Sequence, residues 1–178
     1  MITSLLQKIK PIGEVDTVFL KKLESIDLEP IMCRMVKGKH YLWSIEKAVH
    51  IAELFKCFLY LVHKYPTAAI VPTFEVDDFW HEYLGDNAKY NLETTDLFGS
   101  ILIHFGYYGM RGEADSKLRD KSYEITLSLF EEQFGNAQLF LGKAAECSPV
   151  CIYDFNISNQ SRMSQNGISL IRPTLASL

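Results

Sequence analysis

The sequence has few cysteines and no long uninterrupted apolar run. Four cysteines occur in 178 residues, too few for the disulfide framework of a small secreted domain. The most apolar stretch, 51–62, contains Glu53 and Lys56 and is shorter than the roughly 20 apolar residues that cross a bilayer. The first ten residues lack the long apolar region and the cleavage site of a secretory signal. We therefore expect a soluble, cytoplasmic protein without a membrane span, and only non-classical secretion stays open.

An excess of positive charge is also missing. The formal net charge is -4 and the pI is about 5.7, so nothing draws the whole molecule to nucleic acid, and we expect no nucleic-acid partner. The densest basic stretch contains Arg34, Lys37, Lys39 and His40, which fits either a solvated loop or a small anion-binding edge. No glycine-rich phosphate loop and no internal repeat is present.

Apolar residues at three- and four-residue intervals are abundant and predict helices. The fold class is therefore mainly α: a single compact helical domain of about five helices, with a short extended segment and a flexible C-terminal tail. The predicted helices cover 15–26, the run from the Ser44 cap to Tyr65 before Pro66, 74–84, 88–98 and 114–134. The segment 29–36 follows Pro30 into an extended connection, and 100–108 forms a buried extended segment or an irregular turn. The inward face of the last helix is predicted to carry Leu118, Ile125, Leu129, Phe130 and Phe134.

The character of the chain changes near residue 149. We expect a helical globular domain over 1–148 and a polar tail over 149–178, because the tail has no apolar periodicity to bury. Cys147 and Cys151 flank Pro149. They form at most half of a metal site, since no second Cys/His pair with matching spacing is present.

Most of the chemically interesting residues lie between 70 and 113. The segment 72–84 reads Pro-Thr-Phe-Glu-Val-Asp-Asp-Phe-Trp-His-Glu-Tyr-Leu, and Phe-Gly, a histidine and Tyr-Gly-Met-Arg-Gly follow over 98–112. This pattern resembles the glycine-rich-domain-containing-protein-like family, which has no established biochemical activity and carries an Asp-x-Phe-Trp-His-x-His motif. The resemblance covers roughly 42–135.

The resemblance implies which polar positions to compare. The first and last motif histidines fall on His81 and His104, whereas Tyr83 stands at the second histidine and Thr94 at the cysteine. Three histidines and a cysteine would suit tetrahedral zinc. This chain retains two of those four donors, so zinc is a possible cofactor through His81 and His104, with Asp77, Asp78 or Glu82 as the nearby oxygen donors.

Other roles are open for the same residues. Trp80 and His81 fit a packed aromatic side chain beside a histidine that hydrogen-bonds to a carbonyl or to Asp77, one helical turn away. His81 also fits a general base oriented by Asp77 or Asp78, although no nucleophile is evident. Arg111, between Gly109 and Gly112, fits a structural salt bridge to Asp77 or Glu75, or alternatively a ligand carboxylate.

Two function classes follow. The first is a non-catalytic interaction or adaptor module of a bacterial-type intracellular system, with another protein as its partner. The second is a metal-dependent or acid/base enzyme that uses His81, His104 and a carboxylate in a pocket roofed by Trp80, Tyr107 and Tyr108. The absence of a recognisable nucleophile favours the module, and whether the chain is an enzyme stays open.

Overall fold

The computed structural model describes residues 5–10, 13–136, 138 and 142–145. Over these residues the chain is mainly helical, as predicted. An isolated antiparallel bridge joins Thr73 to Ala144, and the described residues contain no strand longer than such a bridge. The predicted tail, 149–178, and Cys147 and Cys151 lie outside the described residues. The elements are the 3-10 helix η1 (Leu5–Lys8), α1 (Gly13–Ser25), α2 (Glu29–Lys37), α3 (Ile45–Lys64), α4 (Phe74–Gly85), α5 (Asn87–Phe98) and α6 (Glu113–Phe134).

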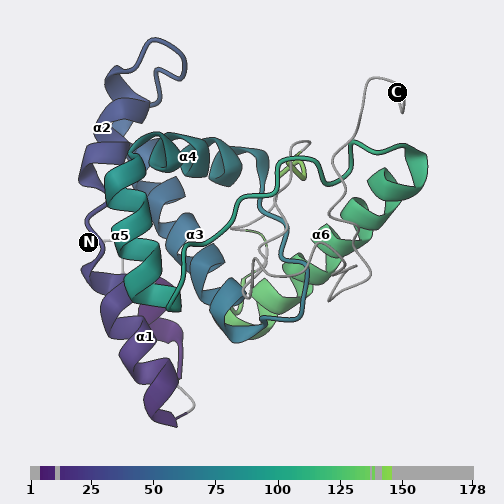
Figure 1. The fold of residues 1–178 in the computed structure, drawn as a ribbon, viewed down its shortest axis with the longest axis horizontal. Helices are drawn as coiled ribbons and strands as arrows, with labels where there is room; N and C mark the ends of the chain where they lie inside the picture. The colour runs from purple at the N-terminus through teal and green to yellow at the C-terminus, as the bar shows by residue number, and fades with distance from the viewer. Residues whose placement is uncertain (1–4, 11–12, 137, 139–141, 146–178) are drawn as a thin grey trace.

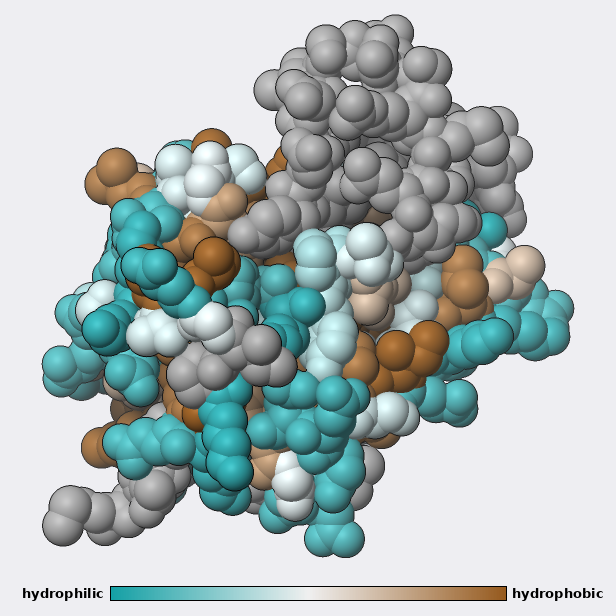
Figure 2. Space-filling view, turned by 90° about the horizontal axis from the view of Figure 1, so that it is seen from below, coloured by the Kyte–Doolittle hydropathy of each residue, from teal (hydrophilic) through white to brown (hydrophobic). Residues whose placement is uncertain are grey.

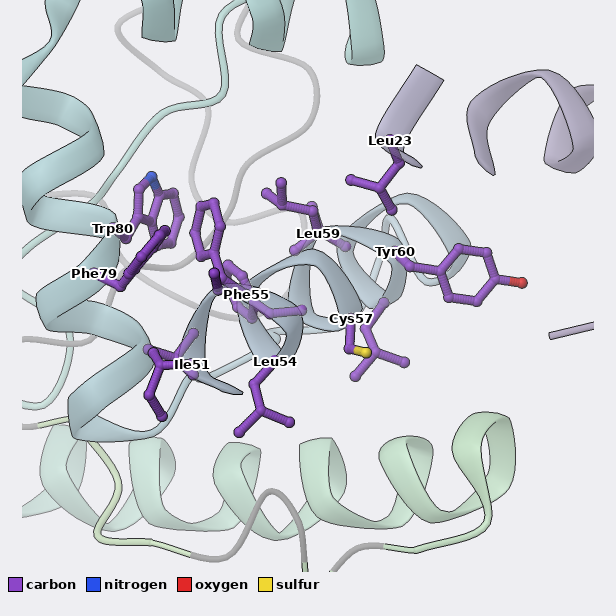
Figure 3. Close-up of a cluster of buried hydrophobic side chains, with 14 of the residues drawn as sticks. Leu23, Ile51, Leu54, Phe55, Cys57, Leu59, Tyr60, Phe79 and Trp80 are labelled. Atoms are coloured by element: carbon purple, nitrogen blue, oxygen red, sulfur yellow. The ribbon is translucent and has the colours of Figure 1, made fainter. Parts of the chain in front are cut away.

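The centre of the molecule is α3. Ser44 caps it by accepting a hydrogen bond from Lys47 N at 3.1 Å, and the helix ends before Pro66, both as predicted. Its surface is apolar over more than one stripe, and it contacts η1, α1, α2 and α4 (Figure 1). Phe55 packs on Phe79 and Trp80 of α4 at ring-centroid distances of 5.4 and 6.2 Å, whereas Leu54 points toward α6 (Figure 3).

The segment 29–36 is a helix, and the prediction of an extended connection there is wrong. Pro30 occupies the first turn of α2, where its missing N–H would have no intrahelical acceptor. Asp27 accepts a hydrogen bond from Glu29 N at 2.9 Å, and Ile31 and Met35 bury one face against the core. Proline starts this helix rather than breaking it.

The last helix begins and ends within a residue of the prediction, but its inward face differs. Phe130 and Phe134 are buried as expected, whereas Leu118 and Ile125 are 38% and 45% exposed. Their inward places are taken by hydroxyl-bearing residues, namely Ser122, Tyr123 and Thr126.

These buried hydroxyls fasten α6 to the rest of the chain. Thr126 Oγ1 accepts a hydrogen bond from Val71 N at 2.9 Å, and Ser122 Oγ lies 2.8 Å from the Tyr108 hydroxyl. Hydrogen bonds satisfy groups that would otherwise be costly to bury, so polar residues face the core here. No helix in the described part of the chain is long and apolar enough to cross a membrane.

Candidate functional site

Three side chains that can bind a metal ion converge beside α4. Asp77 and His81 are four residues apart on this helix, which places them on one face. His104 comes from the irregular connection between α5 and α6, which Figure 1 shows running past α3 and α4 on its way to α6. One ligand atom from each residue lies within 4.8 Å of the others.

The distances within this trio are short. His81 Nε2 and His104 Nε2 are 2.9 Å apart. The Asp77 oxygens lie 3.4 Å from His104 Nε2 and 3.7 Å from His81 Nε2. Donors bound to one zinc ion at about 2.0–2.1 Å lie roughly 3.0–3.4 Å from one another in tetrahedral or octahedral arrangements. The trio therefore needs little movement to hold an ion.

The Asp77 carboxylate is buried, but it lacks a full set of hydrogen-bond donors and a cationic partner. Its side chain is 7% exposed, and its Oδ1 atom has no hydrogen-bond partner. Both neighbouring groups are imidazoles, and no lysine or arginine of the described residues lies within 4.0 Å. A buried carboxylate without a cation or a full set of donors is unfavourable, so this site lacks a positive charge.

The two histidines differ in access to solvent. The His104 side chain is 10% exposed and the His81 side chain is 41% exposed. Partial burial lowers the pKa of His81, and His104 lowers it further, while the Asp77 carboxylate opposes both effects. His81 therefore favours the neutral form, which is the form that coordinates metals.

Trp80 positions the buried histidine. Its ring meets the His104 ring edge-on at 4.8 Å between centroids. Its Nε1 donates to the Tyr90 hydroxyl at 3.0 Å, and that hydroxyl donates to Leu102 O at 2.7 Å. This chain of hydrogen bonds holds the backbone two residues before His104, so Trp80 supports the site from the core.

The two other positions compared through the family resemblance carry Tyr83 and Thr94. Both side chains form hydrogen bonds outside the trio. Tyr83 is fully buried and its hydroxyl donates to Glu93, while Thr94 Oγ1 donates to Tyr90 O at 2.8 Å. Neither joins Asp77, His81 and His104 in the group that can hold an ion. The structure thus supplies one oxygen and two nitrogen donors.

Of the carboxylates considered from the sequence, only Asp77 joins the histidines. Asp78 bonds with Tyr41 and Glu82 pairs with Arg34 at 2.9 Å. Burial raises the pKa of the Asp78 carboxyl to about 6, and the charges of Asp77 and Glu75 add to this shift.

Arg111 does not pair as predicted. Its guanidinium lies on Asp115, with Nη2 to Oδ1 at 2.6 Å and Nε to Oδ2 at 3.1 Å, in place of Asp77 or Glu75. The Asp115 carboxylate also accepts a hydrogen bond from Gly109 N at 2.7 Å. Gly109 has a φ of 87°, a conformation that favours glycine. The 109–115 turn is thus held at the N-terminus of α6 by its own ion pair.

The predicted aromatic roof is wrong for two of its three members, Trp80 and Tyr108, whereas Tyr107 is half-buried. Trp80 and Tyr108 are fully buried, and the Tyr108 hydroxyl contacts Ser122 in the core. Both are parts of the support beneath the site, because their rings pack inward. His81 is the member of the trio that reaches the surface.

A second histidine cluster was missed from the sequence. Asp16 of α1 is buried against His63 and Lys64 at the end of α3, with Oδ1 3.3 Å from His63 Nε2 and Oδ2 2.5 Å from Lys64 Nζ. Phe19 stacks on His63 at 3.8 Å between ring centroids. The only sequence signal was an acidic residue at a position that the helical spacing of α1 turns toward the core.

Comparisons with known proteins add no relative. Protein-family models, curated proteins and solved structures give no match to this chain. The family resemblance therefore stays a prediction.

Proposed function

We propose that Asp77, His81 and His104 bind one divalent transition-metal ion and that the chain is a metal-dependent enzyme. The observation that carries this proposal is the buried Asp77 Oδ1, which has no hydrogen-bond partner although two imidazoles face the same carboxylate. A divalent ion supplies the missing positive charge and uses the lone pairs of both rings. It also replaces the contact between the two Nε2 atoms.

The donor set favours zinc or ferrous iron. Two nitrogens and one carboxylate oxygen occur in catalytic zinc sites with three protein ligands, and two histidines with one carboxylate also form the facial triad of non-haem iron enzymes. Calcium and magnesium prefer oxygen donors, so they suit this trio less well. Zinc is our first choice because it needs no redox partner.

Three protein ligands leave a coordination position for water or substrate. The exposure of His81 gives solvent access to the site, whereas Asp77 and His104 are largely buried. An ion in this position would acidify a bound water and polarise a carbonyl or phosphoryl oxygen. Hydrolysis or hydration is therefore the reaction class that the site supports best.

A zinc titration of chelator-treated protein tests the proposal. We expect one zinc ion per chain, with at least a hundredfold weaker binding in His81→Ala and in His104→Ala, because each removes one of three ligands. His50→Ala is the matched control, since His50 lies on α3 and is not part of the trio. Equal affinity in all four proteins, or no saturable binding by the wild type, contradicts the proposal.

An interaction module is a second candidate, favoured by exposed apolar residues at the start of α3. Leu42 and Ile45 are 74% and 66% exposed, and Leu42 has a φ of 50°, which is unusual for a bulky side chain. Apolar side chains otherwise lie in scattered groups on the face shown in Figure 2. A strained, exposed leucine at a helix entry suits a contact with another protein.

A pair of variants separates the two candidates. Leu42→Ser with Ile45→Ser should abolish capture of a specific protein from the host without changing zinc affinity, and His81→Ala should do the reverse. If His81→Ala abolishes both, the metal site organises the partner surface. If neither change affects capture, the module hypothesis is wrong.

A further inference from the structure

A basic pocket lies between the end of α2 and the exposed side of α4. Its volume is about 430 Å³, which is within the usual size of small-molecule sites. The last turns of α2 and the turn that follows, which together contain the basic stretch noted in the sequence, form one wall. The lining residues are Cys33, Arg34, Lys37, Gly38, His40, Tyr41 and Glu82.

One cation of the pocket is held in place. Arg34 Nε lies 2.9 Å from Glu82 Oε2, and its guanidinium is so close to the Gly85 backbone that a Cβ there would come within 2.9 Å of Nη2. Arg34 therefore crosses from α2 to α4 and forms a fixed, charge-compensated side of the pocket.

The other cationic side chains are uncommitted. Lys37 and His40 are exposed, and neither makes an ion pair or a hydrogen bond with any residue that the structure describes. Arg34 and Lys37 contribute two positive charges and Glu82 one negative charge, which leaves a net charge of +1 from these three side chains. This local excess is opposite in sign to the formal net charge of -4 of the whole chain.

We propose that this pocket binds the phosphate group of a small phosphomonoester. A phosphomonoester carries about -1.5 to -2 charges near neutral pH and three strong acceptor oxygens, so the unpaired Lys37 ammonium attracts it more strongly than it attracts a monocarboxylate. Lysine binds phosphate as a point charge and needs no bidentate geometry. The volume leaves space for an organic body beside the phosphate.

The site is separate from the metal trio, although α4 contributes to both. Glu82 lines the pocket and directly follows His81 in the sequence. Tyr41, which also lines the pocket, forms a hydrogen bond with Asp78, the residue after Asp77. The phosphate proposal does not depend on a bound metal, because no ligand of the trio lines the pocket. It is therefore tested on chelator-treated protein, where phosphate cannot bind to a metal ion.

The test is a titration of the full chain with inorganic phosphate at constant ionic strength, followed by amide NMR shifts of residues 33–41. We expect saturable binding that is about tenfold weaker in Lys37→Ala, since one charge-assisted contact is lost. Lys39→Ala is the matched control: it removes the same charge two residues further along the chain, but Lys39 does not line the pocket. Its affinity should change less than twofold.

Four results would overturn the proposal. The first is an absence of saturable shifts in the wild type. The second is an equal loss in Lys37→Ala and Lys39→Ala, which would mean diffuse attraction to a basic turn. The third is equal affinity for acetate and phosphate. A loss of stability in Lys37→Ala with unchanged phosphate affinity would also refute it, because Lys37 would then serve only the C-terminal end of the α2 dipole.

Discussion

Two aspartate and histidine clusters in this chain differ in what neutralises the carboxylate. At Asp16, Lys64 Nζ lies 2.5 Å from one oxygen and His63 Nε2 lies 3.3 Å from the other. At Asp77, both neighbours are imidazoles and one buried oxygen has no hydrogen-bond partner. Both carboxylates are buried to nearly the same degree, so burial alone does not separate them.

The two clusters also differ in their access to solvent. Phe19 covers His63 and the Asp16 cluster joins α1 to the end of α3, so it is closed and structural. The Asp77 cluster opens to solvent at His81. Removing the carboxylate of a buried pair with an ammonium destabilises the fold, whereas the Asp77 carboxylate, which lacks a cation, is where we propose that a metal ion binds.

The largest effect on stability is expected at the cluster of Asp16, His63 and Lys64. Asp16→Asn leaves the Lys64 ammonium without its carboxylate, and the free energy of unfolding should fall by about 3 kcal/mol. Urea denaturation followed by tryptophan fluorescence measures it. Asp96→Asn is the control, since Asp96 pairs with Lys22 on the surface and such pairs contribute about 1 kcal/mol or less. Equal losses in the two variants would mean that the Asp16 cluster does not hold the fold.

The next largest effect is expected at Trp80, which packs on His104 beneath the Asp77 cluster. Trp80→Phe removes the hydrogen bond to Tyr90 and part of the packing on His104, so the free energy of unfolding should fall by about 2 kcal/mol. Zinc should bind roughly tenfold more weakly, as when the residues behind metal ligands are altered. Trp43→Phe, at the other tryptophan, should leave zinc affinity unchanged. An unchanged affinity in Trp80→Phe would show that Trp80 does not position His104.

A smaller effect, opposite in sign to that of Asp16→Asn, is expected at Asp77 itself. In the presence of chelator, Asp77→Asn should leave the free energy of unfolding unchanged or raise it by up to about 1 kcal/mol, because a neutral amide replaces an uncompensated buried charge. Urea denaturation with a zinc chelator tests this. A loss as large as that of Asp16→Asn would make Asp77 a structural residue.

The smallest effect concerns pH. Burial lowers the pKa of His63, although the hydrogen bond and charge of Asp16 oppose the shift. The unfolded chain then binds more protons than the folded one as pH falls through the ordinary histidine pKa of about 6.5, so stability should decrease below that pH. Denaturation at pH 7.5 and 5.5 should show a smaller decrease in His63→Gln than in the wild type. An equal decrease in both would assign the effect to other groups.

Local signals in the sequence predicted most of the helices. The Ser44 cap, Pro66, Gly99 and Gly135 set helix ends because each acts on the backbone next to it. The segment 29–36 was misread because proline both starts and breaks helices. The inward face of α6 was misread because hydroxyls that find hydrogen-bond partners far along the chain are as compatible with burial as leucine is.

The candidate site was only partly predictable. Asp77 and His81 share a helix face by spacing, and the family resemblance pointed to His104, but nothing in 99–112 shows that this connection returns to α4. The partner of Arg111 was a nearby carboxylate, Asp115, and the link from Asp16 to His63 and Lys64 joins residues almost fifty positions apart. Such contacts depend on how the helices pack.

The most direct test of the central claim is the zinc and iron content of untagged protein purified without chelator, compared with Asp77→Asn and Asp16→Asn. We expect close to one metal ion per wild-type chain, loss of the ion in Asp77→Asn, and full retention in folded Asp16→Asn. A folded wild type without metal that also fails to take up added zinc would contradict it.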